Sequence, residues 1–248
     1  MDRDGPVATV VLDRPDRLNA QTPHTWAALR EAGRTLPDGV RVVVVRGEGR
    51  AFSAGLDRAA FAPGGIPGTP SLPEIAALPE HEGDATVRAY QEAFSWLRRP
   101  DLISVAAVHG HAIGAGFQLA LACDLRVLAD DAMFTMAEST LGLVPDLGGT
   151  APLVAAVGYA RALEICLTAR RVGAAEALTL GLATLVVPRA ELAAAVADLV
   201  AALLTPAAGA VTETKALLLG APGRSREEQE AAERAAQLRR LRDLAKLI

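Results

Sequence analysis

Two glycine-rich segments of the sequence could supply paired backbone hydrogen-bond donors. These segments, Phe52-Ser-Ala-Gly-Leu-Asp57 and Gly110-His-Ala-Ile-Gly-Ala-Gly116, each follow an apolar run that is typical of a buried strand. Glycine lets the backbone approach a ligand and turn its amide N–H groups into a cleft. The second segment also opens a predicted helix, whose first N–H groups lack internal partners and carry partial positive charge. Two such donors that converge on one point would form an oxyanion hole.

The elements around these segments alternate between strand and helix, which indicates an α/β domain. A helix is expected after the first strand, with Thr22 as its N-cap and Pro23 at its first position. The uniformly apolar run of valines at 42–45 predicts a strand that is covered on both faces of its sheet. Strands are predicted at 7–12, 42–45, 103–108, 125–129 and 133–136, and further helices around Val87–Leu97 and after Gly116.

The stretch from Phe61 to Pro79 is rich in proline and glycine and shows no periodicity. This pattern predicts a long loop. Loops of this length within a compact domain are uncommon and often belong to a binding site.

The composition changes after Pro188 and becomes helical. Helices are predicted from Ala190 to Leu204 and from about Ala207 to Leu219, and the last helix opens with Ser225 and Glu228 at the capping-box spacing. We therefore expect two regions, an α/β core over 1–190 and a helical C-terminal region over 191–248.

The composition excludes several classes of protein. With 51% hydrophobic and 22% charged residues, a disordered chain is not expected. The net charge is −4 and no basic stripe is interleaved with aromatic residues, which argues against nucleic-acid and membrane-surface binding. Neither an N-terminal apolar leader nor an apolar run long enough to span a bilayer is found, so we expect a cytoplasmic protein. Cys123 and Cys166 lie in apolar runs and are expected to be buried thiols.

Several familiar motifs are ruled out. Gly114-Ala-Gly116 lacks the third glycine of a dinucleotide-binding fingerprint, because Leu119 occupies that position. His109 and His111 have no third ligand nearby, so no metal site is expected. Ser53 does not lie in a nucleophile elbow.

Six stretches of the sequence, in family order and with family-like spacing, resemble the crotonase (enoyl-CoA hydratase/isomerase) superfamily. They are Arg14-Pro-Asp-Arg-Leu-Asn-Ala20, Phe52-Ser-Ala-Gly-Leu-Asp57, Gly110-His-Ala-Ile-Gly-Ala-Gly-Phe-Gln118, Ala122-Cys-Asp124, Phe134-Thr-Met-Ala-Glu138 and Gly142-Leu-Val-Pro-Asp-Leu-Gly-Gly-Thr150. The resemblance covers nearly the whole chain.

The resemblance implies a ββα-spiral core that binds acyl-CoA or enoyl-CoA thioesters. It also implies a homotrimer or a dimer of trimers held together by the C-terminal helices, and no cofactor apart from coenzyme A as part of the substrate. The oxyanion-hole donors would be the N–H groups of Leu56 and Ala115. The residues implied to bind CoA or substrate are Arg17, Leu18, Ala54, Asp57, Arg58, Gly114 and Leu141.

The catalytic positions depart from the hydratase pattern. Two glutamates flank the substrate in hydratases. The second matches Glu138, but the first falls on Gln118, whose amide cannot exchange a proton at neutral pH. Gln118 lies three residues after Ala115 on the predicted helix, so its side chain leans toward the oxyanion donor and is expected to orient a partner.

Asp146 stands where many hydratases have glycine, at a position that carries a functional aspartate in dienoyl-CoA isomerases and chlorobenzoyl-CoA dehalogenases. The match to either group is incomplete. Two interpretations remain open: Asp146 is a second acid or base, or it caps a helix that starts around Gly148-Gly149-Thr150.

Glu138 is the main catalytic candidate, because burial after an apolar strand would raise the pKa of its carboxyl toward the working pH. One base can shift a double bond, so the sequence favours isomerisation of an enoyl-CoA. The alternatives are an enoyl-CoA hydratase with Glu138 as main acid and base, and an acyl-CoA-binding protein with impaired catalysis.

Overall fold

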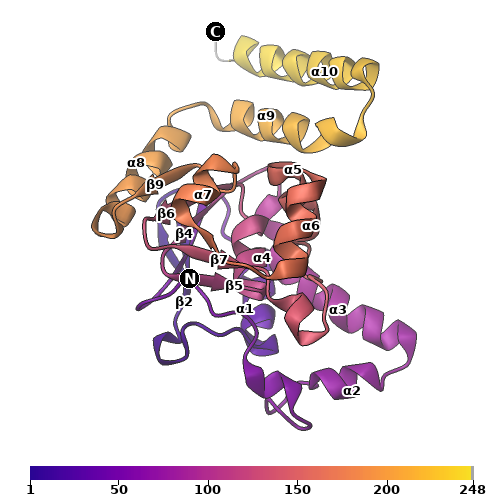
Figure 1. Cartoon of the computed structure of the whole chain (residues 1–248). Helices are drawn as coiled ribbons and strands as arrows, with labels where there is room; N and C mark the ends of the chain where they lie inside the picture. Colours follow the sequence, from indigo (N-terminus) through magenta and orange to yellow (C-terminus); the bar gives the residue numbers. More distant parts are fainter. Residues whose placement is uncertain (247–248) are drawn as a thin grey trace.

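A six-stranded, mostly parallel sheet forms the centre of the molecule (Figure 1). The computed structural model describes residues 1–246. The first strand is antiparallel to the second, and all other neighbours are parallel. In spatial order the strands are β1 (Asp2–Asp4), β2 (Val7–Leu12), β3 (Val42–Gly47), β4 (Ile103–Val108), β6 (Leu125–Ala129) and β9 (Leu185–Val187).

A second, three-stranded sheet lies beside the first and carries one of the two glycine-rich segments. Its strands are β5 (His111–Ile113), β7 (Met133–Thr135) and β8 (Val172–Gly173), with β5 parallel to β7 and β7 antiparallel to β8. The segment Gly110–Gly116 therefore contains a short strand, which the glycine pattern did not predict.

The two faces of the six-stranded sheet bury different apolar clusters. In β3, Val43 and Val45 point into the larger cluster, while Val42 and Val44 point into the smaller one on the opposite face. Alternate strand residues point to opposite faces, so four consecutive valines require cover on both sides. The expectation of a doubly covered sheet is confirmed.

The α-helices cover the two faces of the sheet or project from it. They are α1 (Pro23–Arg34), α2 (Leu72–Ala76), α3 (Glu80–Ser95), α4 (Ala115–Ala122), α5 (Thr150–Val157), α6 (Tyr159–Thr168), α7 (Ala174–Thr179), α8 (Leu192–Leu204), α9 (Ala208–Gly220) and α10 (Arg226–Ala245). The predicted N-cap is confirmed, because the Thr22 hydroxyl accepts the Thr25 N–H at 3.2 Å. The capping box of Ser225 and Glu228 at the start of α10 is confirmed as well.

The predicted loop over Phe61–Pro79 is wrong for its second half. Leu72–Ala76 forms the short helix α2, and Ser71 caps it in a capping box with Glu74. The serine–glutamate spacing was present in the sequence, but five residues are too short to show a helical period.

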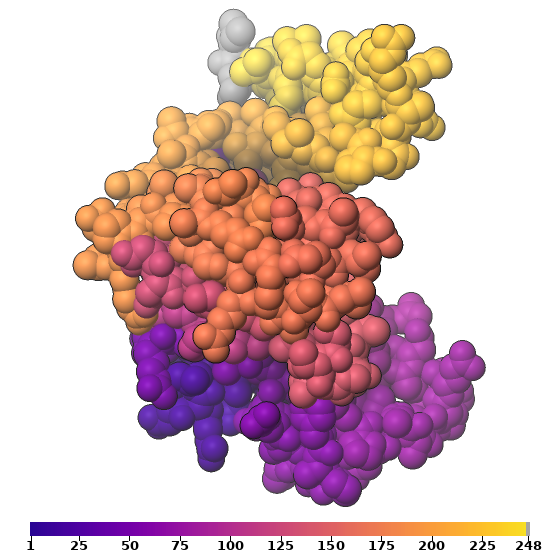
Figure 2. Space-filling view, viewed as in Figure 1, coloured from indigo at the N-terminus to yellow at the C-terminus, as the bar shows by residue number. Residues whose placement is uncertain are grey.

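The C-terminal region divides into a part that covers the sheet and a part that projects from it. Residues Leu192, Val196 and Val200 of α8 pack on the smaller apolar cluster, so this helix shares the core of the preceding residues. Figures 1 and 2 show α9 and α10 as a pair at one end of the molecule. The division at residue 190 remains a prediction, and residues 247–248 lie outside the described residues.

Among residues 1–246, no single helix is long and apolar enough to cross a membrane. Arg189–Leu204 and Ala208–Gly223 reach the required length and apolar content only as a pair, which is bent by 101°.

One buried ion pair ties α9 to the core. The Lys215 ammonium donates hydrogen bonds to Asp124 Oδ2 and to the Leu102 carbonyl, both at 2.7 Å. Asp124 Oδ2 also accepts the Ser104 N–H at 2.8 Å. Lys215 is the one residue of α9 that is buried, so this contact anchors the projecting pair.

We expect Lys215→Met to lower the free energy of unfolding by about 3 kcal/mol, because it leaves the Asp124 carboxylate without its cation. The combined variant Lys215→Met/Asp124→Asn should recover part of this loss. Urea unfolding measures both changes. If the single variant unfolds at the wild-type urea concentration, the ion pair does not anchor α9.

Candidate active site

The two glycine-rich segments lie side by side and are paired through their backbones. The Ser53 N–H donates to the His111 carbonyl at 2.9 Å, and the Ile113 N–H donates to the Ser53 carbonyl at 2.9 Å. This parallel bridge between Ser53 and Ala112 makes the two chains leave in the same direction. They lead to Leu56 and to Ala115, respectively.

A second parallel bridge, between Gln21 and Leu56, sets the direction of the Leu56 peptide. The Gln21 N–H donates to the Gly55 carbonyl, and the Gln21 carbonyl accepts the Asp57 N–H, both at 2.7 Å. In such a bridge the residue between the two bonded neighbours turns its own N–H to the opposite side. Within residues 1–246 the Leu56 N–H donates to no protein acceptor.

The second amide comes from the start of a helix. Ala115 is the first residue of α4, and its N–H also has no protein acceptor in the described part of the chain. Gly55 lies directly against this helix start: a Cβ there would be 2.4 Å from the Ile113 carbonyl oxygen and 3.5 Å from the Ala115 nitrogen. Any side chain at Gly55 would therefore push the two amides apart.

Glu138 places a carboxylate next to the same helix start. It begins the 3₁₀ helix η4 (Glu138–Leu141) and is only 8% exposed. A Cβ on Gly114 would lie 3.1 Å from Glu138 Oε1, so the carboxylate lies against the residue that precedes Ala115. Glu138 Oε2 is buried and has no hydrogen-bond partner among residues 1–246. One carboxylate oxygen is thus not engaged by the described residues.

Gln118 fixes the other carboxylate oxygen. Its Nε2 donates to Glu138 Oε1 at 2.7 Å. Its Oε1 accepts the N–H groups of Leu147 at 2.8 Å and Gly149 at 3.3 Å. Because backbone N–H groups can only donate, they require the amide oxygen on their side and turn the Nε2 group toward Glu138.

Burial raises the pKa of the Glu138 carboxyl above its ordinary value. The hydrogen bond from Gln118 acts in the opposite direction, because it stabilises the charged form, and the negative charge of Asp146 raises the pKa further. Cys166 lies close enough for the Glu138 charge to add to the effect of burial in raising the pKa of its thiol.

Asp146 lies on the segment that leads to α5, and its residue is exposed at the surface. Its backbone carbonyl accepts a hydrogen bond from Gln91 Nε2 at 2.7 Å. Although the residue as a whole is exposed, partial burial of its carboxyl group raises the pKa of that group. The interpretation of Asp146 as a helix cap is wrong, because α5 begins after Gly149 without a side-chain capping bond.

Five of the seven predicted CoA-binding residues lie on two neighbouring segments, whereas Gly114 precedes α4 and Leu141 ends η4. The Ala54 N–H donates to the Leu18 carbonyl at 2.8 Å, which joins the segment of Arg17 and Leu18 to that of Asp57 and Arg58. Burial would raise the pKa of Asp57, but hydrogen bonds from Ala59 and Arg14 and the charge of Arg17 outweigh it and lower this pKa. Leu141, at the end of η4, is 51% exposed.

A buried polar network, which was not predicted from the sequence, lies behind the first glycine-rich segment. Its side chains are Asn19, Gln21, Trp26 and Ser53, all at most 5% exposed. Gln21 and Ser53 lie 32 positions apart, so no spacing predicts their contact. The one feature of the sequence that could have indicated the network is that two polar residues, Asn19 and Gln21, lie in the first connection after a buried strand.

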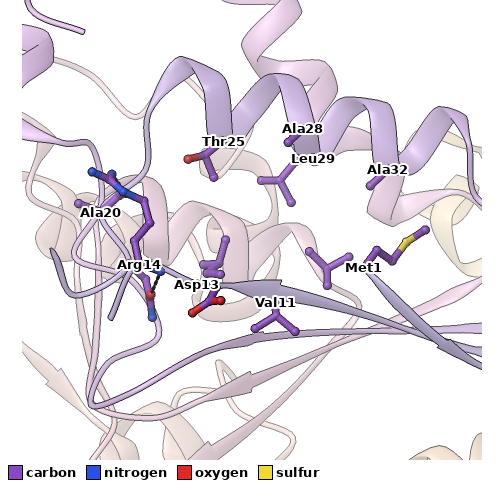
Figure 3. Close-up of a pocket in the computed structure, with 12 residues that line it drawn as sticks. Met1, Val11, Asp13, Arg14, Ala20, Thr25, Ala28, Leu29 and Ala32 are labelled. Atoms are coloured by element: carbon purple, nitrogen blue, oxygen red, sulfur yellow. Dashed lines mark hydrogen bonds between the residues drawn. The ribbon is translucent and has the colours of Figure 1, made fainter. Parts of the chain in front are cut away.

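Two cavities lie away from Leu56, Ala115 and Glu138. One of about 170 Å³ lies between β2 and α1 and is lined by Ala28, Leu29 and Ala32 of the helix and by Val10 and Leu12 of the strand (Figure 3). The other, of about 670 Å³, is a groove between α8 and the sheet face that carries the smaller apolar cluster. Within residues 1–246, no group of three or more His, Cys, Asp or Glu side chains is arranged to hold a metal ion.

The contacts of Glu138 predict opposite shifts of its pKa in two variants. Gln118→Leu removes a hydrogen bond to the charged form, so the pKa should rise. Asp146→Asn removes a neighbouring negative charge, so the pKa should fall. Infrared titration of the carboxylate, taken as the difference from Glu138→Gln, measures both. Asp198→Asn, on the exposed side of α8, is the control, and equal titrations in all variants would contradict the assignment.

Comparisons with known proteins agree with this geometry. The family model of enoyl-CoA hydratase/isomerase matches residues 2–243. One similar structure is that of a Thermobifida fusca YX protein described as an enoyl-CoA hydratase, which was solved in complex with acetoacetyl-CoA. Its sequence is 52% identical to this chain, and the two structures superpose with a TM-score of 0.94. The match covers 98% of this chain and 94% of the other.

Two curated relatives carry more specific names. The carnitinyl-CoA dehydratase of Salmonella typhi is 36% identical over 86% of this chain and 77% of its own length. The peroxisomal Delta(3,5)-Delta(2,4)-dienoyl-CoA isomerase of Arabidopsis thaliana is 33% identical over 90% of this chain and 80% of its own. With its mixed α/β fold and its family match from end to end, the chain belongs to the enoyl-CoA hydratase/isomerase family of enzymes.

Proposed function

We propose that this enzyme isomerises the double bond of an enoyl-CoA, with Glu138 as the group that moves the proton. Glu138 removes a proton from C2 of a 3-enoyl thioester, which gives a dienolate. It then returns the proton to C4, and the double bond moves from C3–C4 to C2–C3. No further reactant is needed.

The thioester oxygen becomes negative in the dienolate, and the amides of Leu56 and Ala115 are suited to stabilise it. Both N–H groups lack protein acceptors within residues 1–246, and Gly55 lies between their segments without a side chain. Fixed donors in a site that excludes water stabilise such a charge better than water does, and loss of one donor costs about 3 kcal/mol of the barrier.

The contact between Gln118 and Glu138 is the observation that favours isomerisation. Hydration requires a proton to be taken from water and another to be delivered to the substrate. Gln118 can do neither, and its amide is already held by Leu147, Gly149 and Glu138. The free oxygen, Glu138 Oε2, suffices for a transfer that uses one proton twice.

Hydration or dehydration is the second candidate, and Asp146 is the observation that favours it. Its charge acts on Glu138, so a second carboxyl group is near the first. The dehydratase name of the Salmonella typhi relative supports this candidate. Here Asp146 would supply the second proton transfer.

Coenzyme A is the proposed carrier of the acyl group. The exposed side chains of Arg17 and Arg58 flank Asp57 and leave a cationic rim that suits phosphate groups. The Thermobifida fusca protein was solved with acetoacetyl-CoA, which supports the same ligand class here.

We expect Glu138→Gln to lower kcat for 3-enoyl-CoA isomerisation at least about 100-fold, because the amide cannot carry the proton. CoA binding, followed by calorimetry, should persist. Glu191→Gln, an exposed residue of η5 (Arg189–Glu191), is the matched control and should keep full activity.

The products of the wild-type enzyme decide between the candidates. Conversion of 3-enoyl-CoA without hydration of crotonyl-CoA supports isomerisation. Hydration of crotonyl-CoA with 3-enoyl-CoA left untouched would contradict it. If neither substrate is turned over while CoA binds, the chain is an acyl-CoA-binding protein and the proposal fails.

The α9–α10 pair is proposed to be an oligomer contact, in a homotrimer or a dimer of trimers. In α10 only Ala236 is buried, while Leu238, Leu241 and Leu244 are each about half exposed, at 51%, 48% and 57%. These leucines follow at intervals of three and lie on neighbouring positions of the helix surface. A helix with so little burial needs another surface to be stable.

Light scattering after size-exclusion chromatography should therefore give a native mass that is a multiple of 25.7 kDa. Leu241→Glu should reduce it, because a charge replaces an apolar contact. The exposed substitution Glu230→Gln on the same helix is the control. A wild-type protein that elutes as a monomer would contradict this proposal.

A further inference from the structure

We propose that Gln21 and Ser53 are positioning residues for the oxyanion hole, and that their side chains fix the turn that carries Leu56 against the start of α4. The inference rests on the proposed function, because it assigns a purpose to the donors at Leu56 and Ala115. Neither side chain is expected to touch the substrate, since both residues are fully buried, at 0% exposure.

Ser53 connects the two donor-bearing segments. Its backbone N–H and its carbonyl are both hydrogen-bonded to β5, which leads to Ala115. Its Oγ accepts the Gly55 N–H at 3.2 Å and donates to the Asn19 carbonyl at 2.8 Å. The backbone of Ser53 therefore holds one segment, while its side chain holds the turn that carries Leu56.

Gln21 sets the orientation of this hydroxyl. The Trp26 indole N–H, which can only donate, bonds to Gln21 Oε1 at 2.8 Å. The amide must then present Nε2 on its other side, where it donates to Ser53 Oγ at 3.1 Å. With these donors in place, the hydroxyl proton of Ser53 points to the Asn19 carbonyl. Each hydrogen bond in the series thus has one possible direction.

The packing around Ser53 leaves no space for adjustment. A Cβ at Gly116 would lie 2.8 Å from the Ser53 Cβ and 2.6 Å from its carbonyl oxygen, so the first turn of α4 rests directly on this serine. A shift of Ser53 must therefore move the amides of Leu56 and Ala115 relative to each other. Displacement of a catalytic group by about 1 Å can cost 100-fold in rate.

A structural role alone would also explain a buried polar network. The test must therefore measure the hydrogen bonds that the oxyanion hole donates to a bound thioester. A chromophoric enoyl-CoA absorbs at longer wavelength when its thioester carbonyl is polarised by hydrogen bonds. The spectrum of the ligand, bound at saturation, reports the two donors without any proton transfer. Glu138→Gln should leave this red shift in place.

We expect Gln21→Leu and Ser53→Ala to reduce the red shift and to lower kcat about 10-fold or more, with KM little changed. Trp26→Phe keeps an aromatic ring but removes the indole N–H, so it should also reduce the red shift and kcat. This variant decides the matter if the other two fail to fold. Ser104→Ala is the matched control: Ser104 is equally buried and also hydrogen-bonded, but it lies in β4 next to Asp124.

Ser104→Ala should lose stability and keep the full red shift. Folded Gln21, Ser53 and Trp26 variants that retain both the wild-type red shift and kcat would overturn the inference while the proposed function stands. A wild-type complex without any red shift would instead contradict the oxyanion hole itself, and the positioning role with it.

Discussion

Two single-residue backbone bridges hold the site together. The bridge between Ser53 and Ala112 makes the two glycine-rich segments parallel, and the bridge between Gln21 and Leu56 turns the Leu56 N–H away from the Gln21 segment. The first bridge is made to the short strand β5, whereas the second joins two residues that lie outside any strand. The large sheet brings the ends of its strands close together. The two bridges then set the directions of the Leu56 and Ala115 amides.

The second constraint is that both the nitrogen and the oxygen of the Gln118 amide are already hydrogen-bonded within the protein. A carboxylate at this position would have to share a proton with Glu138, because like charges at hydrogen-bond distance cannot both be ionised. The amide avoids this conflict and donates to one oxygen of Glu138. Burial still raises the pKa of Glu138, so the site combines a fixed geometry with a carboxyl group whose proton affinity is increased. This combination is the basis of the proposed isomerisation, in which one proton moves between two carbon atoms.

Much of the fold could be predicted from local patterns. Runs such as Val42–Val45 predict buried strands, and the helix caps at Thr22 and Ser225 follow from side-chain chemistry that acts within four residues. The helix at Leu72–Ala76 was missed because it is too short for a hydrophobic period.

The candidate site was predictable only in part. The motifs identified Leu56, Ala115 and Glu138 as candidates, whose roles remain predictions. The partners of Gln118 and the network of Gln21 and Ser53 join positions that are tens of residues apart, and only the folded chain brings them together. For Asp146, local spacing suggested a helix cap, whereas the helix begins after Gly149 without one.

The most direct test of the central claim is a crystal structure of this enzyme with a bound acyl-CoA thioester. The account predicts that the thioester oxygen lies about 2.7–3.1 Å from both the Leu56 and the Ala115 nitrogen, the range for oxyanion-hole donors. It also predicts that C2 of the acyl group lies beside Glu138 Oε2. A thioester that binds with its carbonyl away from these two nitrogens would contradict the account.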